Sequence, residues 1–429
     1  MLLKTILNRC YRFKRFVYGS CRFEENGDVP KIIVQILPRK NSKPKCSSCG
    51  SFGPIYDHLP VRLYQFIPIW GISVEFEYAR RRVSCATCKI AAEEIPWARG
   101  KQQKTLPYLA FLASWAEELP WVRVAQRFRT SWHTVYRAVQ WVVGYGLIHR
   151  KLHTITAIGV DEIQYQKGHK YLTLVYQLDQ GCRRLLWVGR ERSIEAFREF
   201  FTTIGALVPD FRQQLKFVCS DMWKAYLRVI REEVPDALHI LDRFHIRAKF
   251  SDALDKVRRQ EVHRLIKEGK DPVLAKSRWC FLKKRSNLTS TQRGCLKGLL
   301  QLNLRTIKAY LLVEQFEHFW TYKSATWAGK FLKAWTRQAM YSKIDPMKDV
   351  AKMLRRHEEL ILNWFRARKQ INNGIAEGFN LNVKLAMRKA RGFRSFDVAE
   401  VALFHQLGDL PRPSFKHQFW TRNRCVYIA

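Results

Sequence analysis

The side chains of this chain that are best placed to do chemistry are carboxylates that come directly after apolar stretches. Asp161 follows the apolar run at 157–160 and is itself followed by Glu162, and Asp221 follows the apolar residues of FVCSD. Two carboxylates that are held close together repel one another unless a cation lies between them. A hard divalent cation prefers oxygen ligands of this kind. If the two apolar stretches are neighbouring strands that stop at the acids, Asp161 and Asp221 are expected to share a metal ion.

A third acid is expected from a distant part of the chain. The best candidate is Glu377, in the first turns of a helix that follows the Asn372-Asn373-Gly374 segment. Glu162 is the alternative to Asp161 as a ligand, but it points to the other side of the strand, which favours Asp161. Each acid alone is an ordinary turn or helix residue, so only their joint pattern predicts a metal site. Basic residues that suit phosphate follow Glu377: Lys384, Arg388, Lys389 and Arg391.

Four cysteines have the spacing of metal ligands. Cys46 and Cys49 form one CxxC pair, Cys85 and Cys88 form a second, and each pair can give two thiolates to one tetrahedral zinc ion. The segment between the pairs is longer than is usual in a zinc ribbon, but short strands fit there. The alternatives are reduced cysteines without a metal, or a redox pair, for which the surrounding βαβ pattern is missing. The spacing therefore predicts a structural zinc site with all four cysteines as ligands.

Residues 119–143 have the pattern of two short helices joined by a tight turn. A helix over 121–128, a turn at 129–131 and a second helix over 132–143 match a helix-turn-helix, with Ser131 as the cap of the second helix. The side chains expected to face a DNA major groove are Trp132, His133, Thr134 and Arg137. The residues expected to pack inward are Val135, Ala138 and Val139. An ordinary helical hairpin is the alternative interpretation.

The elements that must position the acids follow from the apolar pattern between 154 and 247. Three consecutive strands are expected in TITAIGVDEIQ, KYLTLVYQLD and RRLLWVGRE. A helix capped by Ser193, a strand in QLKFVCSD, a second helix and a strand in ALHILDRFH follow. This order predicts an α/β core with a mixed five-stranded sheet. Residues 1–100 resemble short strands, and 248–371 form a helical segment whose tryptophans are expected mostly in its core.

Net charge is the abnormal feature of the composition. The 429 residues contain 76 Lys and Arg against 37 Asp and Glu, which gives a formal net charge of +39. Like charge of this size opposes compaction unless a polyanion screens it, so nucleic acid is favoured over the alternative of a membrane surface. The sequence has no apolar run long enough to span a membrane and no secretory signal, and its 11 cysteines indicate a reducing compartment. A soluble, intracellular protein of several domains is expected.

Taken together, these motifs resemble one known family over nearly the whole chain. CSSCG and CATC near the N-terminus, the helix-turn-helix pattern, IGVDEIQYQKGHKYLTLVYQLDQG, VCSDMWKAYLRVI, ILDRFHI and NNGIAEGFNLNVKLAMRKARGFRSF are similar to the bacterial insertion-sequence transposases of the ISL-three family. The resemblance implies a ribonuclease H-like fold with an all-helical insertion before Glu377. It also implies catalytic and magnesium-binding roles for Asp161, Asp221 and Glu377. Asp242 and His245 match a further signature and are expected to support the site.

The resemblance implies a DDE transposase that cleaves DNA and transfers strands. Three carboxylates that hold two Mg²⁺ ions ~4 Å apart, for which Mn²⁺ can substitute, would clamp an in-line displacement at phosphorus. The attacking oxygen comes first from water and then from the freed DNA 3′-hydroxyl, with no covalent protein intermediate. His245 is expected to shuttle a proton or orient a ligand, and a purely structural histidine is the alternative.

The expected partners are double-stranded DNA at the terminal inverted repeats and at the target, and a second copy of the chain in a synaptic homodimer. The bacterial cytoplasm is the expected location. Two other functions are alternatives: a zinc and helix-turn-helix DNA-binding regulator without catalysis, and a ribonuclease H-like nuclease that does not join strands. The expected domains are zinc-binding (1–100), helix-turn-helix (101–150), catalytic (151–247 with 371–411), helical insertion (248–370) and C-terminal tail (412–429).

Overall fold

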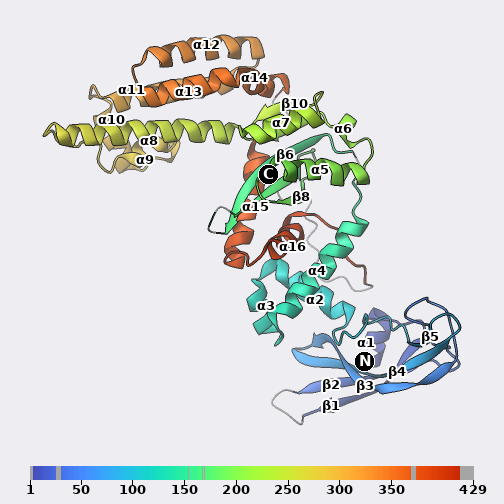
Figure 1. Cartoon of the computed structure of the whole chain (residues 1–429). Helices are drawn as coiled ribbons and strands as arrows, with labels where there is room; N and C mark the ends of the chain where they lie inside the picture. The colour runs from blue at the N-terminus through green and yellow to red at the C-terminus, as the bar shows by residue number, and fades with distance from the viewer. Residues whose placement is uncertain are drawn as a thin grey trace. The chain divides into compact units, whose positions relative to one another are not determined.

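A computed structural model of the chain describes residues 3–25, 30–152, 154–166, 168, 170–368 and 373–415, without the side chains of 373–377 and 380. The chain divides into two compact units, one formed by residues 1–151 with 386–429 and the other by residues 152–385. Each unit contains a sheet with both parallel and antiparallel strands (Figure 1). The mixed α/β fold expected from the sequence is therefore confirmed.

The first unit begins with a mixed sheet over an aromatic core. Trp97 is fully buried, and its ring contacts those of Phe16, Tyr64 and Tyr78. The strand order is β1-β2-β4-β3, with β5 beside β4, and only β2 and β4 run parallel. The elements are α1 (Leu3–Cys10), β1 (Phe16–Glu24), β2 (Lys31–Pro38), β3 (Ile55–Ile69), β4 (Ile72–Cys85) and β5 (Lys89–Ala92).

Helices complete the first unit. Ser131 caps the helix that it precedes, because its hydroxyl accepts a hydrogen bond from the N–H of Thr134. That helix begins at the predicted residue but continues to His149, and the buried Gly146 beyond the predicted end lies against Leu410 and Pro411. The helices are α2 (Leu106–Glu118), α3 (Trp121–Arg127), α4 (Trp132–His149) and α16 (Phe396–Leu407).

The second unit contains the five-stranded mixed sheet that the apolar pattern predicted. The strand order is β10-β9-β6-β7-β8, in which β6, β9 and β10 run parallel and β7 and β8 are antiparallel to their neighbours. The first and fourth strands of the segment are therefore direct neighbours. The strands are β6 (Ala157–Gln166), β7 (Lys170–Gln177), β8 (Arg184–Arg190), β9 (Phe217–Ser220) and β10 (Leu238–Leu241).

Helices cover both faces of this sheet. On one face, aromatic side chains of α5 (Ile194–Leu207) and α7 (Lys224–Glu233) join apolar strand residues in one buried cluster, next to the short helix α6 (Phe211–Gln214). On the other face, Phe379 of α15 (Asn373–Ala390) stacks on Tyr176 with ring centroids 4.5 Å apart. The sheet is thereby buried on both sides, as its continuous apolar strands require.

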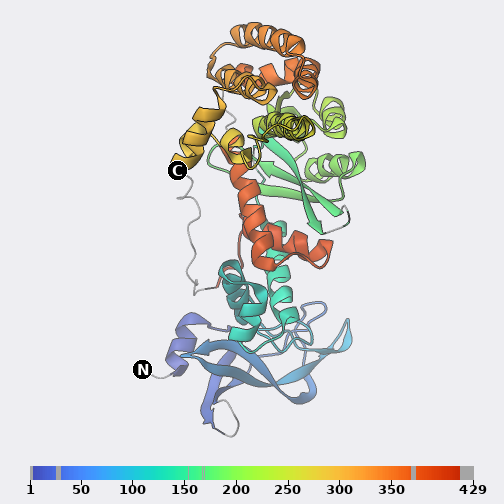
Figure 2. The ribbon, with the colours of Figure 1, turned by 90° about the vertical axis from the view of Figure 1, so that its left-hand side faces the viewer.

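The segment after β10 is helical, as predicted. Figures 1 and 2 show these helices gathered beside the sheet, on the side of β10. Trp335 lies in their core, where its indole N–H donates to the carbonyl of Leu312 at 2.9 Å, whereas Trp327 is 59% exposed. No helix within the described ranges is long and apolar enough to cross a membrane. The helices are α8 (Arg243–Lys267), α9 (Arg278–Leu282), η1 (Arg285–Asn287), α10 (Ser290–Leu299), α11 (Arg305–Glu317), η2 (His318–Thr321), α12 (Ala325–Tyr341), α13 (Asp345–Arg356) and α14 (Glu358–Arg366).

Candidate functional site

Three carboxylates form one row at the carboxyl ends of the parallel strands. β6 and β9 are paired in register, and Asp161 and Asp221 each lie two residues beyond the last pair. β9 and β10 are paired in the same way, and Asp221 and Asp242 each lie one residue beyond their last pair. Neighbouring strands are only about 4.8 Å apart. The register therefore brings Asp161, Asp221 and Asp242, the acidic row, to one edge of the sheet.

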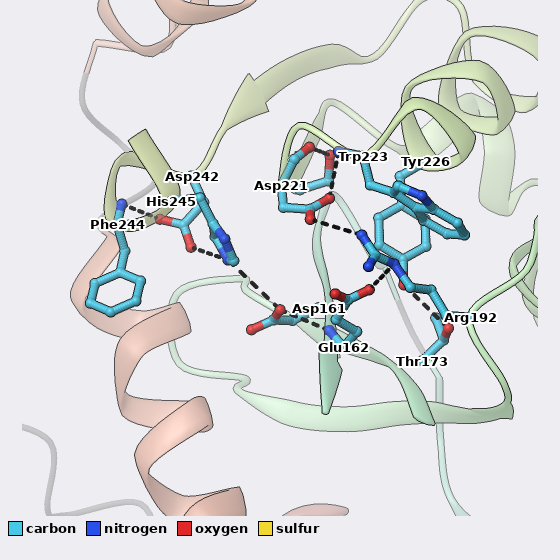
Figure 3. Close-up of polar contacts among 11 residues, drawn as sticks. Asp161, Glu162, Thr173, Arg192, Asp221, Trp223, Tyr226, Asp242, Phe244 and His245 are labelled. Carbon is cyan, nitrogen blue, oxygen red and sulfur yellow. Dashed lines mark hydrogen bonds and ion pairs between the residues drawn. The ribbon is translucent and has the colours of Figure 1, made fainter. Parts of the chain in front are cut away.

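The apolar run stops at Asp161, but the strand does not: β6 continues past the acids, through the rest of the expected TITAIGVDEIQ segment. β6 pairs with β7 as far as Gln166 but with β9 only as far as Gly159. Since β9 ends before Asp161 is reached, one edge of β6 is open at this point, and buried residues give way to partly exposed ones. Figure 3 shows the carboxylates of Asp161 and Asp221 pointing toward the same space.

Local backbone donors orient each carboxylate of the acidic row. Oδ1 of Asp161 accepts from the N–H of the next residue at 2.7 Å. Oδ1 of Asp221 and Oδ1 of Asp242 each accept from the N–H two residues further on, at 2.9 Å in both cases. The bond at Asp242 also caps the first turn of α8. A main-chain N–H close in the sequence thus helps to orient each of the three acids.

His245 lies between two members of the acidic row. Its Nε2 atom is 3.8 Å from Oδ1 of Asp161 and 3.8 Å from Oδ2 of Asp242. It is in the first turn of α8, which begins directly after Asp242. The structure therefore brings together the predicted supporting residues, Asp242 and His245, beside Asp161.

Arg192, two residues after the end of β8, contacts the site, and no pattern in the sequence would have identified it. Its Nε pairs with Oε2 of Glu162, its Nη2 is 3.7 Å from Oδ2 of Asp221, and its guanidinium lies 4.3 Å from the ring centroid of Trp223 (Figure 3). Burial raises the pKa of Glu162 to about 7, Arg192 opposes that rise, and the charges of Asp221 and Asp161 add to it. Negative charge is thus concentrated at this sheet edge.

A buried polar chain lies behind the acidic row and was also missed by sequence reasoning. The hydroxyl of Ser220 is 2.8 Å from Nε2 of His239, and the amide of Asn363 donates to the carbonyl of His239 at 2.7 Å. Burial lowers the pKa of His239 to about 4. Ser220 directly precedes Asp221, so this chain connects α14 to the strand that carries a member of the acidic row.

The third predicted acid falls where the structure gives only the backbone. Glu377 lies in α15, but its side chain is outside the described residues. Of the basic residues that follow, Lys384, Arg388 and Arg391 are exposed. Lys389 is half-buried, and its ammonium donates to the main-chain carbonyls of Ala116 and Glu117.

The four predicted zinc ligands meet in the first unit. The sulfur atoms of Cys46, Cys49, Cys85 and Cys88 all lie within 4.8 Å of one another. Two turns present them: Gly50 has a φ of +78° and donates to the carbonyl of Cys46, and the second turn connects β4 to β5. Tetrahedral zinc with Zn–S bonds of about 2.3 Å requires sulfurs roughly 3.8 Å apart, which this cluster allows. Among the side chains described, no other group of three or more potential ligands converges as closely.

The electrostatics of the cysteine cluster also fit a cation. Hydrogen bonds from Ser51 lower the pKa of Cys49 to about 6. Hydrogen bonding to Cys49 raises the pKa of Cys88 to about 12. Such crowded thiols cannot all ionise unless a positive ion joins them. Four sulfur donors suit zinc, whereas the carboxylates of the acidic row are hard oxygen donors and suit magnesium.

The four residues predicted to contact DNA occupy the first turns of α4. His133 and Arg137 are exposed, while Trp132 and Thr134 are half-buried. Trp132 stacks on Tyr136 with ring centroids 5.5 Å apart. The residues expected to pack inward, Val135, Ala138 and Val139, have no exposed surface.

The sequence of this chain is similar to those of known transposases. Residues 158–403 match the sequence model of the ISL-three type, which is described as "Transposase". The chain is 31% identical over 381 residues to the "Transposase for insertion sequence element IS1001" of Bordetella parapertussis, and the match covers 88% of this chain and 92% of that protein. It is 28% identical over 410 residues to the "Transposase for insertion sequence element IS1557" of Mycobacterium tuberculosis, covering 89% and 90%.

One solved structure that matches is the "Drosophila P element transposase strand transfer complex". The TM-score is 0.36 with 9% sequence identity, and the match covers 72% of this chain and 92% of that chain. A similarity of this size adds nothing to the argument on fold.

Proposed function

The chain belongs to the ISL-three family of insertion-sequence transposases, and from that membership we propose that it cleaves and joins DNA strands at a metal site formed by Asp161, Asp221 and Glu377. That it is a DNA transposase follows from the family. The observation that carries the finer proposal is the register of β6 and β9, which aligns Asp161 and Asp221 at one sheet edge. A ribonuclease H-like core is the fold that we propose for this unit.

The side chains of the site would hold the metal ions and orient the groups around them. Asp161 and Asp221 offer carboxylate oxygens that are oriented by main-chain N–H groups, and Glu377 would complete the set from α15. Two bound Mg²⁺ or Mn²⁺ ions would supply Lewis acidity for in-line displacement at phosphorus. His245, beside Asp161, is positioned to orient that carboxylate or to accept a proton from the attacking hydroxyl.

The first unit would supply recognition of the transposon ends. We propose zinc as the ion that the cysteine cluster holds, and α3 with α4 as a helix-turn-helix that contacts the terminal repeats through His133 and Arg137. Two ends must be brought together for transposition, so a homodimer is proposed as the active assembly.

The test is a cleavage and joining assay on DNA that carries the insertion-sequence ends, with Mg²⁺. Asp161→Asn, Asp221→Asn and Glu377→Gln should each lower cleavage by at least about 100-fold, because a metal clamp contributes several kcal/mol to the transition state. Binding to the ends should change little. Asp236→Asn, which removes an exposed carboxylate of the same unit, is the matched control and should retain activity.

Each other outcome identifies a different function. Specific binding by the unsubstituted chain without any cleavage would support a DNA-binding regulator. Cleavage without strand joining would support a nuclease. Activity that survives substitution of one acid would remove that acid from the site.

A further inference from the structure

The position of Arg192 is determined by more than its ion pairs. The preceding residue, Glu191, has a φ of 72°, a conformation that is rare and strained for a side chain of this size. Its carbonyl accepts from the hydroxyl of the fully buried Thr173 at 2.8 Å, and its N–H donates to the carbonyl of Tyr171 at 3.0 Å. These bonds fix a strained turn, and that turn directs the next side chain over the sheet edge. Such strain persists only where the surrounding structure maintains it.

The guanidinium of Arg192 has two ionic contacts and one contact with an aromatic ring. It pairs with Glu162, lies 3.7 Å from the carboxylate of Asp221, and stacks on the ring of Trp223. Trp223 is itself fixed, because its ring meets Tyr226 edge-on at 4.7 Å. Contact with Glu162 and Trp223 can hold the guanidinium in place even when its contact with Asp221 is lost. The weakest of the three contacts is therefore the one to a proposed metal ligand.

The positive charge of Arg192 affects how tightly a cation can bind at this sheet edge. Asp161, Glu162 and Asp221 concentrate negative charge at one edge, and Arg192 supplies positive charge to the same place. A divalent cation that binds Asp221 must act against this neighbouring positive charge. At an effective dielectric constant of about 20, two charges roughly 4 Å apart interact by several kcal/mol, so the competition is large enough to measure.

We propose that Arg192 is an internal counter-ion of the acidic site, which holds Asp221 before the metal binds and which the divalent cation displaces from that carboxylate. The inference rests on the proposed function, because it takes Asp221 as a metal ligand. Arg192 is a positioning residue in this account. It keeps the negative edge assembled in the metal-free protein, at the cost of weaker metal affinity.

The test measures binding of Mn²⁺ to the full-length, zinc-loaded chain without DNA, by the electron paramagnetic resonance signal of free Mn²⁺. Arg192→Ala and Arg192→Gln should each bind Mn²⁺ at least about tenfold more tightly than the unsubstituted chain, because a competing charge is removed whose effect solvent partly screens. Arg192→Lys keeps the charge and should bind Mn²⁺ as the unsubstituted chain does. Arg198→Ala, which breaks a remote ion pair with Glu232, is the matched control and should have no effect.

The two charge-removing variants distinguish charge from packing. Glutamine keeps a polar side chain of similar reach, so tighter binding in both variants means that charge is the cause. Unchanged or weaker Mn²⁺ binding in Arg192→Gln overturns the inference, even if Arg192→Ala folds poorly. The proposed function fails separately: in that case Asp221→Asn would bind Mn²⁺ as well as the unsubstituted chain does, and the inference would fall with it.

Discussion

At the scale of single residues, contacts within the protein orient the carboxylates of the acidic row. In both Asp221 and Asp242, one carboxylate oxygen accepts a main-chain N–H bond while the other faces a charged or ionisable neighbour, Arg192 or His245. A carboxylate held in this way loses little conformational freedom when it binds a cation. Because the donor lies two residues along the chain in both cases, local sequence supplies one of the contacts that orient each carboxylate, and Arg192 or His245 supplies another.

The buried ring of His239 leads us to predict how the stability of the fold depends on pH. Burial lowers its pKa to about 4, whereas in the unfolded chain it is about 6.5, so the folded state holds the neutral ring. Below pH 6.5 the unfolded chain takes up a proton that the folded chain refuses. Its contribution to stability is therefore present above pH 6.5 and is lost as the pH falls toward 4. Between pH 7 and pH 5 the loss is about 2 kcal/mol.

The measurement is urea unfolding at pH 7 and pH 5, with His239→Gln as the comparison. The variant lacks the titrating ring, so its destabilisation relative to the unsubstituted chain should be about 2 kcal/mol smaller at pH 5 than at pH 7. Other titrating groups are common to both proteins and cancel in the difference. An equal destabilisation at the two pH values would show that His239 is not held neutral.

At the scale of elements, the sequence pattern predicted the strands and helices, because these depend on apolar periodicity and on chain order. The strands β6 to β10, the helices between them and the turn before α4 follow from apolar spacing and from cap residues such as Ser131. Asp161 and Asp221 could be paired in advance because each comes directly after the buried part of its strand. The expected strand already reached Gln164, but the sequence did not predict that β6 is paired on one side only beyond Gly159, since this depends on β7 being a longer partner than β9.

The residues that sequence reasoning missed depend on contacts between distant elements. Arg192 reaches the site through the positive φ of Glu191, and no composition signal marks a non-glycine residue for that conformation. Asn363 contacts His239 from a helix more than a hundred residues further along the chain. Both side chains meet their partners only after the sheet has folded. Neither contact therefore leaves a periodic pattern in the sequence.

The cysteine cluster connects two elements, the turn near Cys46 and the β4–β5 turn. We therefore predict that it holds zinc and stabilises the first unit. The chain should contain one zinc ion per molecule. Cys49→Ser should reduce that content to near zero and lower the melting temperature of the first unit, because metal binding and folding of such a site are coupled. Metal analysis and thermal denaturation measure the two effects. Cys21→Ser, an exposed cysteine of β1 outside the cluster, is the matched control. Equal zinc content in both variants would contradict the assignment.

At the scale of the whole molecule, the net charge of +39 must be reconciled with folding and with DNA binding. Several arginines are neutralised within the fold. Arg22, for example, donates to both carboxylate oxygens of Glu77, and Arg81 is buried against Glu93. Such ion pairs, buried at Arg81 and exposed at Arg22, offset part of the positive charge that the chain offers to phosphate. The exposed basic residues that remain are the ones expected to displace the counter-ions of DNA.

This division predicts how DNA affinity depends on salt. For six to ten phosphate contacts, the affinity should fall by about 10³ to 10⁵ between 50 and 200 mM salt, because each contact releases a condensed counter-ion. Arg137→Ala removes an exposed charge of α4 and should make the slope of log K against log salt shallower by about one. Arg22→Ala removes a charge that Glu77 already neutralises, so its slope should match that of the unsubstituted chain. Fluorescence anisotropy with labelled end DNA over a series of salt concentrations measures all three slopes. If Arg22→Ala and Arg137→Ala changed the slope equally, DNA contact would depend on total charge, and the exposed face of α4 would have no special role.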